Sequence, residues 1–179
     1  LLCFMQPRLH AQQASVLAEG HWVKMGFTSP GVYKISWNKL REMGFSPESI
    51  DPRQLAVYGN PGGMLPQSNS DQRPIDLTEN AIVVSGANDG VFNENDFILF
   101  YVDSPHKTIY DGTTETFQVE KNLYSDSVFY FLTHKPSAGK RARQTPNLGT
   151  DHQKITQSRY LFYHENDLIN LLSSGREWL

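Results

Sequence analysis

Six histidines are the residues of this chain best suited to acid–base or metal chemistry. They are His10, His21, His106, His134, His152 and His164. No two of them stand four residues apart, the spacing that brings two ligands to one face of a zinc-binding helix. Cys3 is the only cysteine, so a zinc site built on several thiolates is excluded. We therefore predict scattered surface or strand-end histidines, and we assign no catalytic, cofactor-binding or metal residue and expect no cofactor.

The tetrapeptide from His164 to Asp167 places an acid beside a base, a combination that suits proton transfer. It lies in an extended, patterned segment, and no nucleophile of recognisable context accompanies it. We interpret it as a strand end or hairpin and not as a catalytic group.

The stretch from Asn88 to Asp96 is the best candidate for a cation site, because it offers several oxygen ligands of the kind that calcium prefers. It does not match the twelve-residue calcium loop: Gly90 is misplaced and the terminal glutamate is absent. Asn and Asp also occupy turns simply by bonding to nearby backbone groups. We predict a plain connection between strands, with bound calcium as the alternative.

A basic cluster follows the last predicted strand and consists of Lys135, Lys140, Arg141 and Arg143. It could meet anionic lipid headgroups or lipopolysaccharide, although a charged loop is usually only solvated. The whole chain carries a net charge of −3, which gives no electrostatic reason to expect nucleic acid as a partner. With 39% hydrophobic residues in 179, the chain is long enough to bury one substantial core.

Both ends of the chain suggest processing or continuation. Leu1 to Met5 is a short apolar run followed by a cleavage-like sequence near Ala11, so residues 1–11 are predicted to be the remnant of a secretory signal peptide. A buried N-terminal strand is the alternative. Apolar residues continue to Trp178 and Leu179. We therefore expect residues 12–150 to form a β-rich domain, and residues 151–179 a linker and the truncated first element of a following domain.

Alternating or continuous apolar runs predict strands at 21–27, 32–37, 54–60, 81–86, 96–103, 116–120 and 127–134. Ser29-Pro30-Gly31 should join the first two as a hairpin. Ser36 should cap a short helix that ends at Gly44. The runs at 81–86 and 96–103 have no polar face, so we expect both to be buried on both sides. An edge strand is expected at 140–144. Short turns and little helix favour an all-β, antiparallel, sandwich-like fold with one or two short helices.

Five segments carry a family resemblance by their order and spacing. They are GVYKISWNKLREMG at 31–44, DPRQLAVYGNPGGMLP at 51–66, DLTENAIVVSGANDGVFNENDFILFYVDSP at 76–105, NLYSDSVFYFLTH at 122–134 and HENDLINLLSSGREWL at 164–179. Together they resemble the N-terminal region of PorU-type proteins of the Bacteroidetes type IX secretion system, relatives of the gingipain cysteine peptidases. The resemblance covers nearly all of residues 20–179, and none of its pieces is a catalytic signature.

The resemblance implies an exported protein at the outer membrane and cell surface. Such proteins are sortases: a cysteine peptidase removes the C-terminal signal domain of cargo and joins the new end to anionic lipopolysaccharide. The catalytic His–Cys pair belongs to a later caspase-like domain, so no catalytic residue is transferred to this chain. The implied role is a non-catalytic N-terminal module of a PorU-like cysteine peptidase. Its implied partners are the downstream catalytic domain, other outer-membrane type IX components and lipopolysaccharide.

Two other functions are compatible with the sequence. A carbohydrate- or adhesin-like binding module would carry exposed, coplanar aromatic rings on one sheet face, whereas rings buried between layers would count against it. A prodomain-like peptidase inhibitor would need a processing site near the end of the segment, for which Arg141, Arg143 and Arg176 are candidates.

Overall fold

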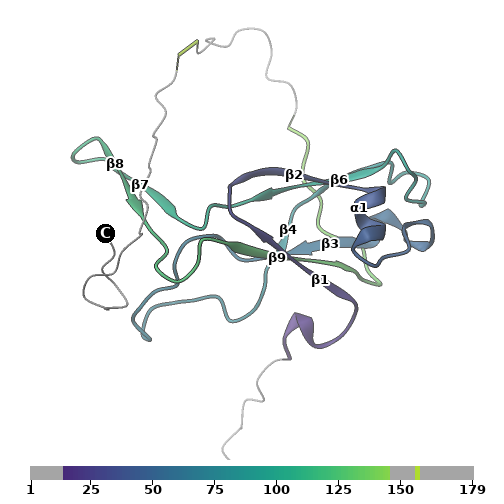
Figure 1. The fold of residues 1–179 in the computed structure, drawn as a ribbon, viewed down its shortest axis with the longest axis horizontal. Helices are drawn as coiled ribbons and strands as arrows, with labels where there is room; N and C mark the ends of the chain where they lie inside the picture. Colours follow the sequence, from purple (N-terminus) through teal and green to yellow (C-terminus); the bar gives the residue numbers. More distant parts are fainter. Residues whose placement is uncertain (1–13, 146–155, 158–179) are drawn as a thin grey trace, which may run out of the picture.

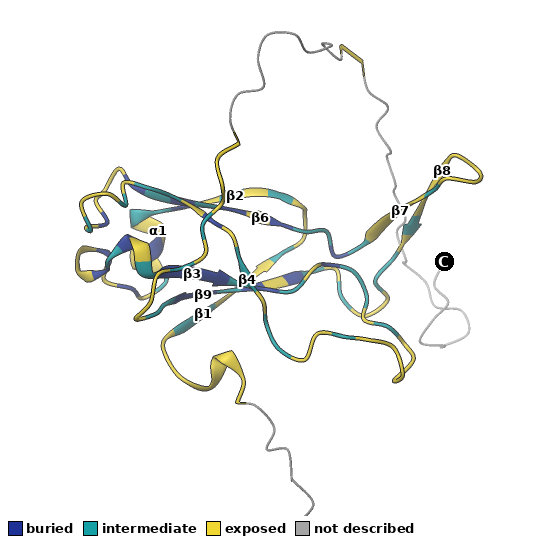
Figure 2. Ribbon diagram, turned by 180° about the vertical axis from the view of Figure 1, so that it is seen from behind, coloured by how far each residue is buried: buried dark blue, intermediate teal, exposed yellow. Residues whose placement is uncertain are grey.

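The computed structural model describes residues 14–145 and 156–157, and in this part of the chain the fold is a sandwich of two antiparallel sheets. The first sheet has the strand order β1 (Trp22–Phe27), β9 (Val128–His134), β3 (Leu55–Tyr58) and β4 (Glu79–Asn80). The second has the order β2 (Gly31–Ser36), β6 (Phe97–Val102) and β5 (Val83–Ser85). Figure 2 shows the two layers one above the other. The predicted all-β class is confirmed.

The remaining elements lie around this sandwich. A two-stranded hairpin, β7 (Lys107–Asp111) and β8 (Thr116–Glu120), extends from one end (Figure 1). The helical elements are α1 (Trp37–Glu42) and the single turns η1 (Val16–Ala18), η2 (Pro47–Ser49) and η3 (Pro52–Gln54).

The core fills the space between the two sheets with alternate residues of each strand, as the period of two demands. Met25, Val57 and Leu132 face inward from the first sheet, and Ile98 and Phe100 from the second. Aromatic rings also meet across the layers, including those of Phe27 and Tyr33, Phe100 and Tyr130. Rings that pack tightly between layers contribute to the core.

The predicted helix is confirmed, and its ends are set by local chemistry. The Ser36 hydroxyl accepts a hydrogen bond from the backbone N–H of Lys39 at 3.3 Å, which caps the first turn of α1. Gly44 follows the helix with a φ of +87°, a left-handed conformation that glycine adopts without penalty. Leu40 turns into the core and anchors the helix to the sandwich.

The predicted hairpin between the first two strands is wrong. β1 pairs with β9, and β2 pairs with β6, so the two strands lie in different sheets. The Ser29-Pro30-Gly31 reversal carries the chain from one layer to the other, where the tilted rings of Phe27 and Tyr33 are in contact, with centroids 4.4 Å apart. A turn signal shows that the chain reverses, but it does not show whether the two strands share a sheet.

The interpretation of the two apolar runs was only partly right. β6 is the central strand of its sheet, but its outer face is open, with Tyr101 59% exposed. β5 is an edge strand, and Val83 is 46% exposed. The second sheet has no layer against its outer face in the described chain, so apolar residues there remain in contact with solvent.

The predicted edge strand at 140–144 is reduced to one bridge. Ile82 and Arg141 form an isolated parallel pair, held by backbone bonds from Ile82 N to Lys140 O at 3.2 Å and from Ala142 N to Ile82 O at 2.9 Å. Ile82 lies in the connection from β4 to β5, which are edge strands of the two sheets. Residues 140–144 therefore cover this side of the sandwich, and we call them the closing segment.

A carboxylate–ammonium pair fixes the same closing segment. Lys135 Nζ lies 2.7 Å from Glu79 Oε2, and Lys140 N donates to Glu79 Oε1 at 2.6 Å. Burial raises the pKa of Glu79, but the hydrogen bonds from Lys135 and Lys140 outweigh it and hold that pKa below its usual value. Burial lowers the pKa of Lys135, and its bond to Glu79 outweighs this and raises it.

These shifts predict a pH dependence of stability. The contribution of Glu79 is present above its unfolded pKa and is lost as the pH falls through its lower folded pKa. Glu79→Gln should therefore lower the free energy of unfolding by about 1–3 kcal/mol at neutral pH, and by clearly less at about pH 3. Urea unfolding at the two pH values measures the difference. Glu94→Gln, at an exposed loop position, is the matched control, and an equal effect of both changes would contradict the assignment.

A candidate docking surface at the hairpin end

The hairpin of β7 and β8 projects away from both sheets (Figures 1 and 2). Its residues are exposed on both faces, and it pairs with no third strand in the described chain. Tyr110 and Phe117 stand opposite each other, with ring centroids 5.1 Å apart. An isolated two-stranded hairpin is at best marginally stable in water, so contact with a further surface would stabilise this one.

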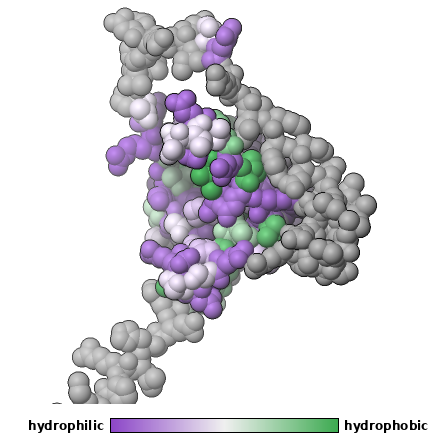
Figure 3. All heavy atoms as spheres, turned by 90° about the vertical axis from the view of Figure 1, so that its left-hand side faces the viewer, coloured by the Kyte–Doolittle hydropathy of each residue, from purple (hydrophilic) through white to green (hydrophobic). Residues whose placement is uncertain are grey.

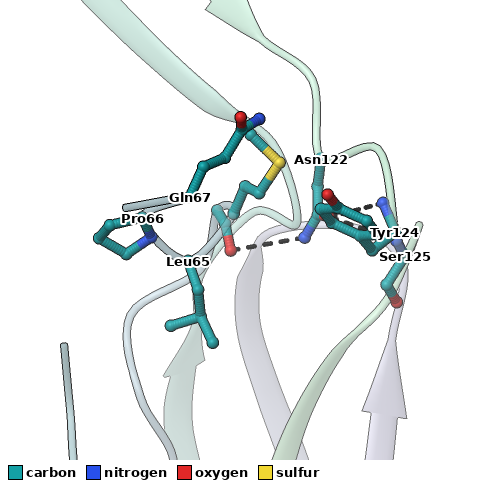
Figure 4. A pocket seen from close by; sticks show the side chains of 8 residues that line it. Leu65, Pro66, Gln67, Asn122, Tyr124 and Ser125 are labelled. Atoms are coloured by element: carbon teal, nitrogen blue, oxygen red, sulfur yellow. Dashed lines mark hydrogen bonds between the residues drawn. The ribbon is translucent and has the colours of Figure 1, made fainter. Parts of the chain in front are cut away.

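A hollow of about 520 Å³ opens beside the base of the hairpin. One wall is the loop from Gly63 to Gln67, and the other is the turn from Asn122 to Ser125. Figure 4 shows the loop side chains on one side and the turn side chains, with the Tyr124 ring, on the other. We call the hairpin, this loop and this turn together the hairpin end.

Asn122 organises the hollow. Its side-chain oxygen accepts hydrogen bonds from the backbone N–H groups of Tyr124 at 3.0 Å and Ser125 at 3.2 Å, and its Nδ2 donates to the carbonyl of Gly63 at 3.4 Å. Its own N–H donates to His106 Nδ1 at 3.1 Å. One amide side chain thus shapes the turn and joins it to the opposite wall, as asparagine often does in turns.

The opposite wall depends on a close backbone approach. Gly62 N donates to Asp103 Oδ2 at 3.1 Å, and a Cβ atom at Gly62 would stand 1.8 Å from the backbone oxygen of Ser104. Only glycine fits there, so the loop is held close to the strand that leads into the hairpin.

Apolar side chains are exposed at this end of the molecule. Figure 3 shows the molecule from this end, with hydrophobic residues lying among hydrophilic ones. Tyr124 is 74% exposed and Leu65 is 59% exposed. The full set of exposed large apolar residues here is Leu65, Ile109, Tyr110, Phe117, Leu123 and Tyr124. Exposed apolar side chains that gather at one end of a molecule, among polar groups, are typical of an interaction site.

The lining of the hollow offers groups for packing and for hydrogen bonding. It contains amide, hydroxyl and apolar groups, and no carboxylate, histidine or lysine. The exposed Tyr110 and Phe117 rings are inclined to each other by 50° and are not coplanar, and Phe27, Tyr33, Phe100 and Tyr130 pack with the core. Both observations count against the carbohydrate-binding alternative.

The sequence-based predictions did not include the surface at the hairpin end, although the glycine pair at 62–63 and the turn sequence after Asn122 were available signals.

Of the histidines singled out from sequence, His106 lies at the hairpin end, where its Nδ1 accepts from Asn122 N, and two others lie elsewhere. His21 packs edge-on against Phe45, and His134 Nε2 lies 2.8 Å from Gln54 Oε1. The described residues include no group of three His, Cys, Asp or Glu side chains placed to hold a metal ion. His10, His152, and His164 with its acidic neighbours lie outside the described residues, as does the predicted signal remnant.

The loop from Asn88 to Asp96 uses its carboxylates to bind its own backbone. Asp89 Oδ1 accepts from Val91 N at 3.0 Å, and Asp96 Oδ2 accepts from Asn93 N at 2.7 Å. Asp96 is buried beneath Gly86, where a Cβ atom would stand 1.8 Å from its Oδ1. These contacts explain the acidic and amide residues as a folded connection.

The predicted basic cluster is divided by its contacts. Lys135 is paired with Glu79, and Arg141 donates four hydrogen bonds to backbone carbonyls. Arg143 is exposed. No helix among the described residues has the length and apolar character needed to cross a membrane.

The fold is a small β-sandwich with exposed apolar residues at its hairpin end, and one solved structure is similar to it. The chain resembles part of a crystal structure of dimeric latent PorU from Porphyromonas gingivalis, with 30% sequence identity and a TM-score of 0.56. The match covers 76% of this chain and 11% of the PorU chain. No protein-family model and no curated protein matches the sequence. The chain is thus similar in sequence and fold to one region of a much longer protein.

Proposed function

We propose that this chain is the non-catalytic N-terminal module of a PorU-like cysteine peptidase and sortase. The observation that carries this proposal is the 30% identity to PorU over 76% of the chain, on a matching fold. The module corresponds to 11% of that protein, so the chemistry of the parent is assigned to the remainder. The hollow at the hairpin end, which lacks acid–base groups in its lining, agrees with a supporting role.

In this role the hairpin end docks on the downstream catalytic part of the same protein. Tyr110, Phe117 and Tyr124 expose apolar surface that a domain contact would remove from water, and such burial favours association. Domain contacts within one chain commonly combine apolar and polar groups, as the hairpin end does. The docked module would hold the catalytic part in position.

The parent protein, on this proposal, is exported to the outer membrane and cell surface. There it cleaves the C-terminal signal domains of cargo and attaches the cargo to anionic lipopolysaccharide. Other outer-membrane components of type IX secretion are its proposed partners. These statements follow from the resemblance to PorU-type proteins.

The test is binding of the module to the separately produced remainder of the parent. The unchanged chain should bind and should hydrolyse no peptide by itself. The double change Tyr110→Ser and Phe117→Ser should weaken binding at least tenfold, measured by calorimetry, because it removes most of the exposed aromatic surface of the hairpin.

The matched control is Tyr101→Ser, because Tyr101 is equally exposed but lies on the outer face of β6. This change should leave binding unaltered. Equal losses for the control and the hairpin variant would argue against the hairpin end, and peptide hydrolysis by the purified module would overturn the non-catalytic assignment.

A second candidate function is inhibition of the parent peptidase, because the related crystal structure is of a latent form. The same titration separates the two functions when peptide turnover is followed. A positioning module leaves turnover by the catalytic part unchanged or raises it, whereas a prodomain-like inhibitor suppresses turnover in proportion to the module bound.

A further inference from the structure

One side of the sandwich is open, in contrast to the side closed by Arg141. β1 and β2 are the end strands of their two sheets, and they lie at the same side because the chain passes directly from one to the other. Each is hydrogen-bonded to a single neighbouring strand in the described part of the chain. Edge strands carry a row of backbone N–H and C=O groups available to an added strand.

A slot of about 380 Å³ lies between these two edges. Its floor is apolar and includes Val23, Phe27, Tyr33 and Met43, all partly buried against the core. An incoming strand would therefore find apolar surface on its inner face as well as backbone partners at its edge. Both are features of strand addition to a sheet.

The outward positions of the two edges carry positive charge and no negative charge. Lys24 and Lys34 are exposed residues of β1 and β2, and neither strand contains an acidic residue. Their ammonium groups lie over the rings of Phe129 and Phe97, at 3.8 and 4.3 Å from the centroids. Lys39, at the end of the slot, is already paired with Glu42 at 2.8 Å.

The positive charge of Lys24 and Lys34 determines which kind of strand can pair with these edges. Lysine on an edge strand opposes pairing with a basic or a second identical edge, whereas opposite charges on paired strands attract. Side chains alternate between the two faces of a strand. A strand added to either edge would therefore place every second residue toward the slot and the others beside the lysine of that edge.

We propose that the slot between β1 and β2 binds an extended segment of a partner protein in which apolar and acidic residues alternate. The apolar residues fill the slot against Phe27 and Tyr33, and the acidic residues pair with Lys24 when the segment adds to β1, or with Lys34 when it adds to β2. The backbone of the segment hydrogen-bonds to the free edge of β1 or β2. The slot is separate from the hairpin end, and this proposal does not depend on the function proposed for the hairpin end.

The test uses a synthetic peptide of alternating valine and glutamate with the complete 179-residue chain. Binding is followed by fluorescence anisotropy and by hydrogen exchange. The peptide should bind, and it should slow amide exchange in β1 or β2. A peptide of alternating valine and lysine should not bind, and a peptide of the same valine–glutamate composition in blocks should bind more weakly.

The protein variants test the lysines. Lys24→Glu combined with Lys34→Glu should weaken binding by about tenfold or more, since the attraction at whichever edge the segment uses becomes a repulsion. Arg143→Glu makes the same type of charge change at an exposed site on the closing segment and should leave affinity unchanged. Should the glutamate pair unfold the protein, Lys24→Gln with Lys34→Gln replaces it, with an expected loss of about threefold.

Four outcomes of the peptide experiments overturn the proposal. They are no binding of the valine–glutamate peptide, equal binding of the valine–lysine peptide, exchange protection confined to the hairpin end, and equal affinity for the lysine variants and Arg143→Glu. Concentration-dependent protection of β1 and β2 without any peptide would assign the slot to a second copy of this chain, and it too would overturn the proposal.

Discussion

Ile98→Ala should lower the free energy of unfolding by about 2–5 kcal/mol, the usual cost of removing a large aliphatic side chain from a packed core. Ile98 is fully buried on β6, the central strand of its sheet, and faces the opposite sheet. Its loss removes contacts to both layers and leaves a cavity that a rigid sandwich cannot close. Urea unfolding of the unchanged protein and of Ile98→Ala measures the change, as a lower midpoint with an unchanged dependence of the free energy on urea concentration.

The control for this prediction is the next residue along the strand. Leu99 points to the outer face of β6 and is half-buried there, so Leu99→Ala should cost about 1 kcal/mol or less. The contrast between neighbours is the direct test of the two-layer arrangement. Equal losses would mean that a further layer covers the outer face of the second sheet, and the fold would have to be revised.

Local features of the sequence predicted most of the elements correctly. The alternation in β1, β2 and β9 reflects one buried face, and Ser36 and Gly44 define α1 through bonds within a few residues. Such signals depend only on near neighbours, so a single sequence contains them.

Strand partners could not be predicted in the same way. β1 pairs with β9, about a hundred residues later, and the reversal before Gly31 changes sheets. β7 was missed because neither of its faces is buried, so its sequence carries no period of two. The run at 81–86 is apolar, yet β5 is a half-exposed edge, because hydrophobicity alone does not distinguish an edge from a centre.

The candidate site was the least predictable part. Its hollow depends on Gly62 lying against Ser104 and on Asn122 reaching Gly63, both contacts between segments distant in sequence. The more conspicuous residues, such as the acidic loop that ends at Asp96, bond to their own backbone. Residue types with acid–base chemistry do not mark the hairpin end, which is distinguished by its shape and by its exposed aromatic rings.

Arg141→Ala should also be strongly destabilising, by about 2–3 kcal/mol. The guanidinium donates from Nη1 to Leu55 O at 3.1 Å, and from Nη2 to Pro52 O at 2.9 Å and Arg53 O at 2.7 Å. Burial lowers the pKa of Arg141 below its usual value, which reflects the cost of removing this charge from water. Its removal takes a side-chain donor from each of these carbonyls and loosens the attachment of the closing segment to β3 and η3, although Pro52 O and Arg53 O still accept from the backbone N–H groups of Leu55 and Gly139.

The matched control is Arg143→Ala, which removes the same side chain from an exposed position two residues away. It should change stability by less than about 0.5 kcal/mol. Hydrogen exchange gives a second readout: the amides of Ile82 and Ala142, which form the bridge of the closing segment, should exchange faster in Arg141→Ala only. Equal behaviour of the two variants would show that the closing segment is not held by Arg141.

Arg141→Lys separates charge from geometry. Lysine retains the positive charge but offers a single ammonium group, whereas the arginine fork reaches carbonyls on two segments at once. If geometry dominates, Arg141→Lys should lose most of the stability lost by Arg141→Ala, with the same faster exchange at Ile82. If charge alone stabilises this side of the sandwich, lysine should restore it. The four hydrogen bonds to carbonyls, with no carboxylate among these acceptors, favour the first result.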